Sequence, residues 1–392
     1  MTEWDLAIVG AGPAGAATAI GALRMAPSMR VALLDRAEFP RDKSCGDGIA
    51  PHVIDLLDSV GVTGIVDDHA PVPRLQLEHN AFTVDRRMAR PAWVIPRSVF
   101  DLRLVEAARS AGAELLRHRV GELTHQGSPV VLDGKVSARM IVGADGAQSA
   151  IRRAIGQDAG PMAVALRGYA PIPSKRSNAL VIVFATAQQP AYAWSFDRGD
   201  GLANVGYGEL LAHREDRRTK AQLIDRLDSL LPGASDGGSH WRGHQLPLSS
   251  GRWRPAAGRV MLAGDAAGLV NPMTGEGIYN AVATGLAAGR AAAEAWAAGE
   301  PDTAGGRYAR ATKPLLAGHL RHIAVAARLC GRSGVIDAGL RASAANRRVF
   351  DDLVELGLAQ GRITATTARG LLRELAGAHR WRVPRLRNNT KE

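Results

Sequence analysis

The sequence predicts an α/β protein in which a nucleotide-binding unit carries an inserted antiparallel sheet and is followed by a helical carboxyl-terminal region. Three observations predict this class. Short apolar runs that end at glycine or an acid occur at the start of the chain, near residue 141 and near residue 260. Between the last two, residues 160–250 show strand-like segments separated by turn residues, and from about residue 302 onward the pattern is helical.

The first segment has the order strand, glycine turn, helix, strand. The apolar run Leu6–Val9 is typical of a buried parallel strand. Gly10 allows a tight turn, Gly12 lets a pyrophosphate approach backbone N–H groups, and Gly15 lets the helix pack closely on the strand. Asp35 follows the second strand, twenty residues after Gly15, where a carboxylate accepts hydrogen bonds from an adenosine ribose. This arrangement predicts a Rossmann-type dinucleotide-binding domain.

Two further strands each deliver a carboxylate beside a glycine. The apolar run that begins at Ile141 ends at Asp145, and the run that begins at Val260 ends at Gly264 and Asp265. A long alanine-rich helix begins close to Ile278. We expect its amino terminus to present free N–H groups, which suits a polyol chain beside an electron-rich ring.

Aromatic residues concentrate in the inserted sheet, where Leu180–Phe184 and Ala203–Gly208 resemble antiparallel strands. One interpretation is an apolar lid over a substrate, and the other is ordinary sheet core. The aromatic residues are Tyr192, Trp194, Phe196, Tyr207, Trp241 and Trp253.

These patterns predict three units along the chain. The nucleotide-binding domain is discontinuous, and a β-sheet domain that binds substrate is inserted into it. The predicted ranges are 1–72, 95–160 and 255–300 for the nucleotide-binding domain, 73–94 and 161–254 for the substrate domain, and 301–392 for the basic helical region. Within that last region we expect helices near Gly306–Leu329, Ala344–Leu358 and Ala365–Gly377.

The positive charge lies in the carboxyl-terminal region. The chain has a net charge of +11, and residues 301–392 contain 17 Lys and Arg against 7 Asp and Glu. Codon bias is one explanation, since only six of the 49 basic residues are lysines. The other is contact with an anionic surface: a membrane, an acyl carrier or a redox partner. The segment Arg380–Arg387, which mixes Arg with Trp and Leu, suits such an interface. No recognition motif accompanies the charge, so we predict no nucleic-acid partner.

The chain has two cysteines, Cys45 and Cys330. They cannot form a disulfide framework or a four-ligand metal site, so we expect reduced thiols and no metal. The acidic start, Met1–Asp5, runs directly into a strand, which is the wrong order for a signal peptide. We therefore expect a cytoplasmic protein that contacts membranes peripherally at most.

Three elements in this order resemble an FAD-containing group that includes aromatic hydroxylases, flavin halogenases and geranylgeranyl reductases. They are the first glycine turn, Asp145–Gly146 and Gly264–Asp265, and the resemblance covers about the first 300 residues. Within this group, Phe39–Ile49 looks like a segment of the geranylgeranyl reductase branch, which includes bacterial menaquinone reductases. Tyr192–Phe196 and Asn204–Gly208 are similar to that branch as well.

The resemblance implies FAD as cofactor and assigns residues to its parts. Gly10, Gly12, Gly15 and Asp35 would hold the ADP half, with Arg97 near the pyrophosphate. Asp265 would hold the ribityl chain, and the run from Gly275 through Gly277 to Ile278 would line the pyrimidine edge of the flavin. The other residues implied to bind FAD are Arg36, Arg41, Cys45, Gly46, Asp145 and Gly264.

The leading hypothesis is reduction of a carbon–carbon double bond in an apolar, prenyl-type substrate. A hydride would pass from the reduced flavin N5, and a proton from Cys45, from a tyrosine such as Tyr207, or from water. Tyr192, Trp194 and Phe196 would bind the substrate. In this interpretation Cys45 donates a proton or shapes the pocket; packing alone explains it equally well. Asp197 stands where the family usually has proline, which bears on the substrate rather than on the flavin.

The alternative is an FAD-dependent monooxygenase that hydroxylates or epoxidises a specialised metabolite, because both chemistries use the same scaffold. A halogenase is disfavoured, since the paired-tryptophan motif of that branch is missing. A flavin-binding scaffold without redox turnover is the non-enzymatic alternative. No second dinucleotide-binding glycine pattern is evident, so NADPH would bind transiently as electron donor, or ferredoxin or a flavin reductase would serve instead.

Overall fold

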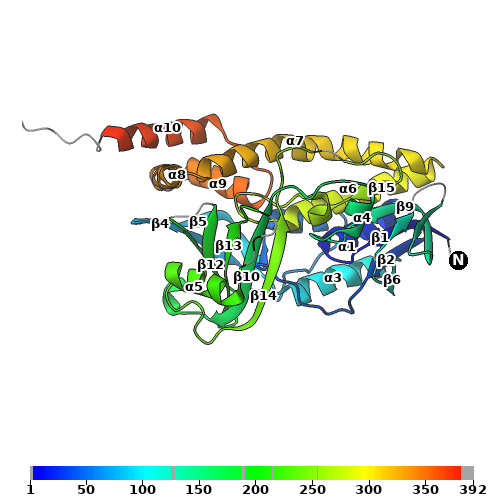
Figure 1. The fold of residues 1–392 in the computed structure, drawn as a ribbon, viewed down its shortest axis with the longest axis horizontal. Helices are drawn as coiled ribbons and strands as arrows, with labels where there is room; N and C mark the ends of the chain where they lie inside the picture. The colour runs from blue at the N-terminus through cyan, green and yellow to red at the C-terminus, as the bar shows by residue number, and fades with distance from the viewer. Residues whose placement is uncertain are drawn as a thin grey trace, which may run out of the picture.

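The computed structural model describes residues 3–124, 129–186, 190–213, 216, 218–253 and 255–380. Two β-sheets lie at opposite ends of the molecule, and long helices run across both (Figure 1). The predicted carboxyl-terminal interfacial segment lies outside the described residues from position 381 onward.

The first sheet has seven strands, and its parallel core has the order β6-β2-β1-β9 with β15 beside β9. The predicted strands 6–9, 31–35 and 141–143 pair in parallel, with Leu6 opposite both Val31 and Met140. The carboxyl ends of these strands therefore meet at one edge, where a nucleotide-binding sheet places its ligand. The strands are β1 (Glu3–Val9), β2 (Val31–Asp35), β6 (Glu114–Arg117), β7 (Leu123–Thr124), β8 (Val130–Leu132), β9 (Val136–Gly143) and β15 (Val260–Leu262).

Helices cover both faces of this sheet. The helix α1 packs against α6 so closely that a Cβ at Gly285 would lie 2.3 Å from the Ala14 carbonyl oxygen, and one at Gly289 would lie 2.1 Å from that of Thr18. The alanine and glycine content of both helices follows from this contact. The helices are α1 (Pro13–Met25), α2 (Pro51–Asp58), α3 (Arg97–Ser110), α4 (Ala150–Ala154) and α6 (Ile278–Ala297).

The second sheet has eight strands in the order β14-β10-β13-β12-β11-β4-β5-β3, antiparallel apart from the β11–β4 pair. One face packs on α5 and the opposite face on α8 and α9. The strands are β3 (Gly48–Ile49), β4 (Val72–His79), β5 (Phe82–Val94), β10 (Met162–Pro171), β11 (Ala179–Phe184), β12 (Ala191–Asp197), β13 (Leu202–Leu210) and β14 (Ser239–Pro247), with α5 at Lys220–Leu230. The α/β class and the inserted sheet are thereby confirmed.

Four helices form the carboxyl-terminal region: α7 (Ala304–Cys330), α8 (Ser333–Ala345), α9 (Arg347–Leu358) and α10 (Ala365–Arg380). The predicted first and last helices are confirmed. The helix predicted near Ala344–Leu358 is confirmed as α9, which begins at Arg347 because the chain is extended at Asn346, whose side chain accepts a hydrogen bond from the Arg348 N–H and caps the helix. A separate helix, α8, was missed. Within the described ranges, no helix is long and apolar enough to cross a membrane.

Candidate functional site

A cavity of about 1150 Å³ extends from the carboxyl edge of the parallel sheet to the helices α7–α10. One end is lined by glycines and charged residues, and the other by aliphatic side chains of the eight-stranded sheet and the helices. Most of the predicted site residues line this cavity. They are Gly10, Gly12, Asp35, Arg36, Arg41, Cys45, Gly46, Arg97, Asp145, Tyr192, Trp194, Phe196, Asp265, Gly275, Gly277 and Ile278, whereas Gly15, Gly264 and Tyr207 lie outside it.

The amino terminus of α1 opens into the polar end. Gly10 has φ +100°, and a Cβ there would lie 2.3 Å from the Ala144 carbonyl oxygen. Gly15 packs on the same turn, since its Cβ would meet the Gly10 oxygen. Gly12, in contrast, faces free space up to Arg41, and no side chain caps the helix. The first turn thus leaves room and backbone donors for a phosphate group, which fits the pyrophosphate of a dinucleotide.

Ion pairs fix the residues around this turn. Asp35 accepts a hydrogen bond from the Ala11 N–H at 2.9 Å. Arg41 lies between two carboxylates, 3.7 Å from Asp35 and 3.2 Å from Asp101. Arg97 is buried and forms two hydrogen bonds of 2.6 and 2.8 Å to Asp101. Burial lowers the pKa of the Arg97 guanidinium, but the neighbouring Asp101 carboxylate raises it, and the net pKa lies above its usual value. Two guanidinium groups are therefore held at this end.

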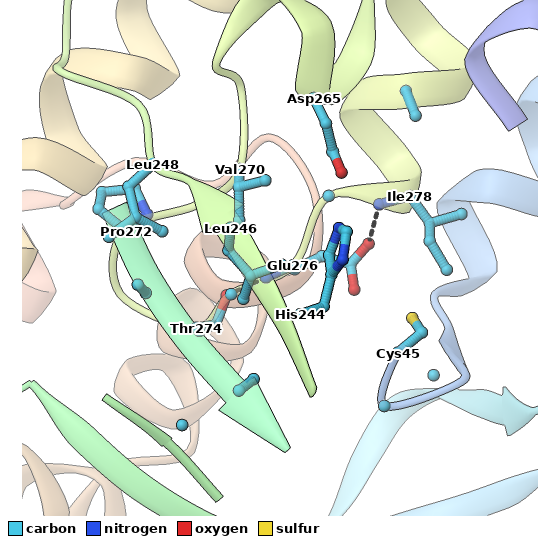
Figure 2. Close-up of a pocket in the computed structure, with 18 of the residues that line it drawn as sticks. Cys45, His244, Leu246, Leu248, Asp265, Val270, Pro272, Thr274, Glu276 and Ile278 are labelled. Atoms are coloured by element: carbon cyan, nitrogen blue, oxygen red, sulfur yellow. Dashed lines mark hydrogen bonds between the residues drawn. The ribbon is translucent and has the colours of Figure 1, made fainter. Parts of the chain in front are cut away.

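Asp265 lies in the short 3-10 helix η2 (Gly264–Ala267) and points into the cavity (Figure 2). Burial opposes its ionisation, yet Lys43, whose Nζ lies 3.3 Å from Asp265 Oδ2, and His244 hold the pKa of this carboxyl below its usual value. Asp145 accepts hydrogen bonds from the Ala150 and Ile151 N–H groups at the start of α4. Gly264 approaches α1 and α6 instead of the cavity, because a Cβ there would lie 3.0 Å from that of Ala14 and 3.2 Å from that of Ala281.

The amino terminus of α6 differs from the expectation of free N–H groups. The carboxylate of Glu276 accepts a hydrogen bond from the Ile278 N–H at 2.7 Å (Figure 2) and another from the Tyr279 N–H at 3.2 Å. Burial raises the pKa of Glu276 to about 7 even though these two bonds favour ionisation. A side chain of this protein therefore already occupies the positive end of the helix dipole.

His244 of β14 and Glu276 both line this cavity (Figure 2). Burial, together with the positive charge of Lys43, lowers its pKa to about 4, so the imidazole is neutral at pH 7. Its Nε2 has no hydrogen-bond partner among the described residues. A neutral ring with an unused nitrogen can accept or donate one hydrogen bond to a ligand.

Cys45 lies across the cavity from Glu276 and Ile278 (Figure 2). Burial raises the pKa of its thiol, although the positive charge of Arg97 acts in the opposite direction. The thiol is therefore protonated at neutral pH and holds a hydrogen that it can donate. As a protonated thiol, Cys45 is a weak nucleophile.

A buried hydrogen-bond network holds the loop that carries Cys45. Asn204 donates to the Cys45 carbonyl and to Asp47, both at 2.8 Å, and accepts from the indole N–H of Trp194 at 2.8 Å. Tyr169 donates to the same Asp47 oxygen at 2.6 Å. Burial raises the pKa of Asp47 to about 6 in spite of these bonds. The Trp194 indole N–H is thereby used to fix the Cys45 loop.

The three aromatic residues of β12 share one face of the sheet. The ring centroids of Tyr192 and Trp194 lie 5.9 Å apart, and those of Trp194 and Phe196 lie 6.3 Å apart. Phe196 covers Gly46, where a Cβ would lie 3.3 Å from the ring. The Tyr192 hydroxyl donates to the Thr274 carbonyl. These rings form one wall between the polar and apolar ends.

Tyr207 is not brought to the cavity. Side chains alternate along a strand, and Tyr207 is paired with Ala193, so it lies on the opposite face from Trp194. It packs against α5, and its hydroxyl donates to Glu209 at 3.0 Å. This placement does not fit a catalytic proton donor.

Two other aromatic residues predicted for a lid also pack elsewhere. Trp241 joins the cluster on α5, and Trp253 donates to Thr312 of α7. The core interpretation is the correct one for Tyr207, Trp241 and Trp253.

The apolar end is enclosed by β4, β5 and β11 on one side and by the carboxyl-terminal helices on the other. On β11, Leu180 and Ile182 face the cavity, while Val181 and Val183 pack against α5. The helices contribute Leu329, Ile336, Leu340, Phe350, Val354 and Leu371, and the segment between α9 and α10 contributes Ile363. This end can bury a long hydrocarbon but offers it few polar contacts.

Comparison with known proteins defines the class. Residues 3–301 match the family model described as FAD binding domain. The chain therefore belongs to this family and is an FAD-dependent oxidoreductase, in agreement with the fit of the α1 turn to a pyrophosphate.

Within that class, the relatives are reductases. A menaquinone reductase of Mycolicibacterium smegmatis is 32% identical over 326 residues, which cover 76% of this chain and 77% of the relative. Digeranylgeranylglycerophospholipid reductase 1 of Methanopyrus kandleri is also 32% identical, over 75% of this chain and 81% of the relative. These matches confirm membership of the geranylgeranyl reductase branch.

Solved structures show the same fold. A geranylgeranyl bacteriochlorophyll reductase-like protein of Thermoplasma acidophilum has a TM-score of 0.79 at 19% identity, over 96% of both chains. A flavin-dependent brominase has a TM-score of 0.71 at 15% identity, over 97% of this chain and 99% of its own.

Sequence reasoning missed four residues of the site: Lys43, Asn204, His244 and Glu276. Lys43, Asn204 and Glu276 lie inside motifs that the sequence analysis identified. Their polar side chains, within otherwise apolar or glycine-rich runs, could have marked them as site residues. His244 lies on a strand with no motif, and only the fold brings it to the cavity.

Proposed function

We propose that this protein reduces a carbon–carbon double bond of a prenyl-type substrate, with FAD at the polar end of the cavity and the prenyl chain at the apolar end. Bound FAD, once reduced, supplies the hydride. The observation that carries the proposal is the continuity of the cavity, because one space joins an uncapped α1 amino terminus to an aliphatic chamber. The names of the two reductase relatives support the same substrate class.

For the cofactor, we propose that the backbone of the α1 turn and Arg41 hold the pyrophosphate, with Asp35 at the adenosine ribose. Asp265, kept ionised beside Lys43, would accept hydrogen bonds from the ribityl hydroxyls. These roles rest on the charges and on the space at Gly12, and a carboxylate beside a polyol is a favourable arrangement.

For the reaction, we propose that the chain positions the alkene, excludes water and supplies a proton. An isolated alkene has no carbonyl to polarise, so positioning makes the largest contribution. The aromatic wall of Tyr192, Trp194 and Phe196 would orient the chain. Cys45 holds a proton on Sγ at neutral pH, and burial raises the pKa of the Glu276 carboxyl to about 7. Cys45 would protonate the carbon that does not receive the hydride.

An anaerobic experiment tests this proposal. The enzyme is reduced chemically and mixed with a menaquinone or a geranylgeranyl compound. We expect reoxidation of the flavin and a product that has gained two hydrogen atoms in its prenyl chain, with the quinone ring unchanged after air oxidation. Failure to transfer electrons to either compound would refute the prenyl substrate.

A monooxygenase is the second candidate, because the solved structures that share the fold include one described as a probable FAD-dependent monooxygenase. Rapid oxygen uptake that depends on substrate and is coupled to an oxygenated product would decide in its favour.

We further propose that electrons arrive from outside the described chain, from transiently bound NADPH, from ferredoxin or from a separate flavin reductase. Anaerobic mixing of the oxidised enzyme with NADPH, followed at the flavin absorbance, separates the first donor from the other two. We also propose that the basic region 301–392 contacts a membrane peripherally, as its excess of arginine suggests.

A further inference from the structure

The carboxyl half of α7 presents a surface that is both basic and apolar. The helix contains five Lys and Arg and no Asp or Glu over Ala304–Cys330. Exposed residues recur there at helical spacing: Arg321, Val325, Arg328 and Leu329. Val325 is 46% exposed and Leu329 is 39% exposed, two of the five large apolar side chains that the described residues leave exposed. A single exposed apolar side chain is ordinary on a protein surface, but two on one helix face, next to exposed arginines, are unusual.

The helix α10 repeats the pattern. Arg369, Leu372 and Arg373 lie on one exposed face, and Leu372 is 66% exposed. The acidic residue of this helix, Glu374, is paired with Arg341 at 3.1 Å. Within the described part of the chain, neither Arg369 nor Arg373 forms an ion pair, so both charges are available to an anionic partner.

The cavity reaches the surface between these helices. Leu329 lines the cavity and is at the same time exposed, and Leu371, the neighbour of Leu372, lines it from α10. Cys330 at the end of α7 and the buried Ile336 of α8 line the same end of the cavity. In Figure 1, α7 and α10 run along the same edge of the molecule. The apolar end therefore comes to the surface at Leu329.

We propose that this surface binds an anionic lipid bilayer, and that the prenyl substrate passes between the bilayer and the cavity through the opening at Leu329. The second part rests on the proposed function. We call the surface the docking face; it consists of Arg321, Val325, Arg328, Leu329, Arg369, Leu372 and Arg373.

Charge and exposed apolar groups together favour a bilayer over a protein partner. The arginines would pair with lipid phosphates, while Val325 and Leu372 enter the headgroup boundary. An acidic protein would satisfy the arginines but would have no need for an aliphatic passage beneath them. A prenyl substrate resides in the bilayer, so an opening at the docking face lets it move without crossing water.

Flotation of the FAD-loaded enzyme with lipid vesicles tests the proposal without any substrate. The vesicles contain phosphatidylcholine alone, or phosphatidylcholine mixed with phosphatidylglycerol. We expect binding to the mixed vesicles only, weakened by salt. The double variant R369E/R373E should bind about 30-fold more weakly or worse, since each basic residue near an anionic surface contributes about 5-fold. Leu372→Glu should weaken binding as well. Bound FAD and the melting temperature report that each variant is folded.

Matched controls lie on the nucleotide-binding side. Met25→Glu changes an exposed apolar residue of α1, and Arg109→Glu an exposed arginine of α3. Both should leave vesicle binding unchanged. Absence of wild-type binding to the mixed vesicles, or equal losses in docking-face and control variants, would overturn the proposal.

The same variants separate this inference from the proposed function. With a prenyl substrate presented in detergent micelles, R369E/R373E should react within about twofold of wild type, whereas with substrate in mixed vesicles it should be at least about tenfold slower. Equal rates of the variant and wild type on vesicles would overturn the passage from the bilayer. Loss of reaction in micelles by the wild type would instead refute the proposed function and leave the vesicle-binding result standing.

Discussion

The two ends of the cavity are built in different ways. At the polar end, backbone turns and ion pairs fix a few residues, such as Gly10 with φ +100° and Arg97 bound twice by Asp101. At the apolar end, alternate residues of β11 and one side of each carboxyl-terminal helix contribute aliphatic surface. The difference teaches that geometry determines what binds at the first end, whereas polarity and volume determine what binds at the second.

Substitution of the two glycines of the α1 turn gives the largest expected effects and tests the polar end. Gly10→Ala forces a Cβ to within 2.3 Å of a carbonyl at a φ that side chains rarely adopt, so we expect a loss of about 3–5 kcal/mol of unfolding free energy. Gly12→Ala meets only Arg41 at 3.4 Å and should keep stability within about 1 kcal/mol while weakening FAD binding about tenfold or more. Thermal melting and flavin titration measure both. Normal FAD affinity of Gly12→Ala would contradict the pyrophosphate assignment.

A charge in the aliphatic wall tests the other end. Ile182 lines the cavity from β11, so Ile182→Arg should lower kcat/KM for a prenyl substrate about 100-fold while FAD content stays normal. Ile182→Leu conserves volume and polarity and should remain close to wild type. If the arginine variant turned over prenyl substrate normally, the chain would have to bind elsewhere.

Removal of Asn204 sharpens the comparison at the junction of the two ends. Asn204→Ala leaves the Cys45 carbonyl and the Trp194 indole without a partner and leaves Asp47 with the hydrogen bond from Tyr169 alone, so we expect a loss of about 2–3 kcal/mol in urea unfolding. Ser195→Ala is the matched control, because Ser195 is fully buried on the neighbouring strand and its hydroxyl has no partner among the described residues. Equal effects of the two substitutions would show that the network does not hold the loop.

The pH dependence of stability tests the buried carboxyl of α6. The native pKa of Glu276 is about 7 against an ordinary value of 4.5, so the folded state binds the proton more tightly than the unfolded state. Its contribution is complete below pH 4.5 and is lost as the pH rises through 7. Relative to Glu276→Gln, the wild type should therefore lose up to about 3 kcal/mol of unfolding free energy across this range. If the unfolding free energies of the wild type and Glu276→Gln changed with pH in parallel, the raised pKa of Glu276 would be contradicted.

The sequence predicted the polar end better than the apolar end, and the reason is locality. The turn from Gly10 to Gly15 and the strand end at Asp35 belong to one short unit whose geometry is dictated by neighbouring residues. The apolar wall is assembled from β4, β11 and α7–α10, which are far apart in the chain. No local pattern distinguishes Ile336 or Leu371, which line the cavity, from ordinary core residues.

Two wrong expectations have clear physical causes. Tyr207 was treated as an aromatic residue of the site, although alternation along β13 places Asn204 and Gly206 on the face of Trp194 and sends Tyr207 to the opposite face. The N–H groups at the start of α6, which we expected to be free, donate to Glu276 instead. Glu276 and Ile278, which form this capping contact, both lie within the run Gly275–Ile278 of the sequence analysis. Attention to alternation and to helix capping would have corrected both.

The most direct test of the central claim is the affinity of the reduced enzyme for menaquinones of increasing prenyl length, measured anaerobically by stopped-flow reoxidation. If FAD and the prenyl chain share one cavity, each of the first isoprene units buries more hydrocarbon, and the apparent Kd should fall about tenfold or more per unit until the aliphatic end is filled. An apparent Kd that does not change with prenyl length would contradict the account.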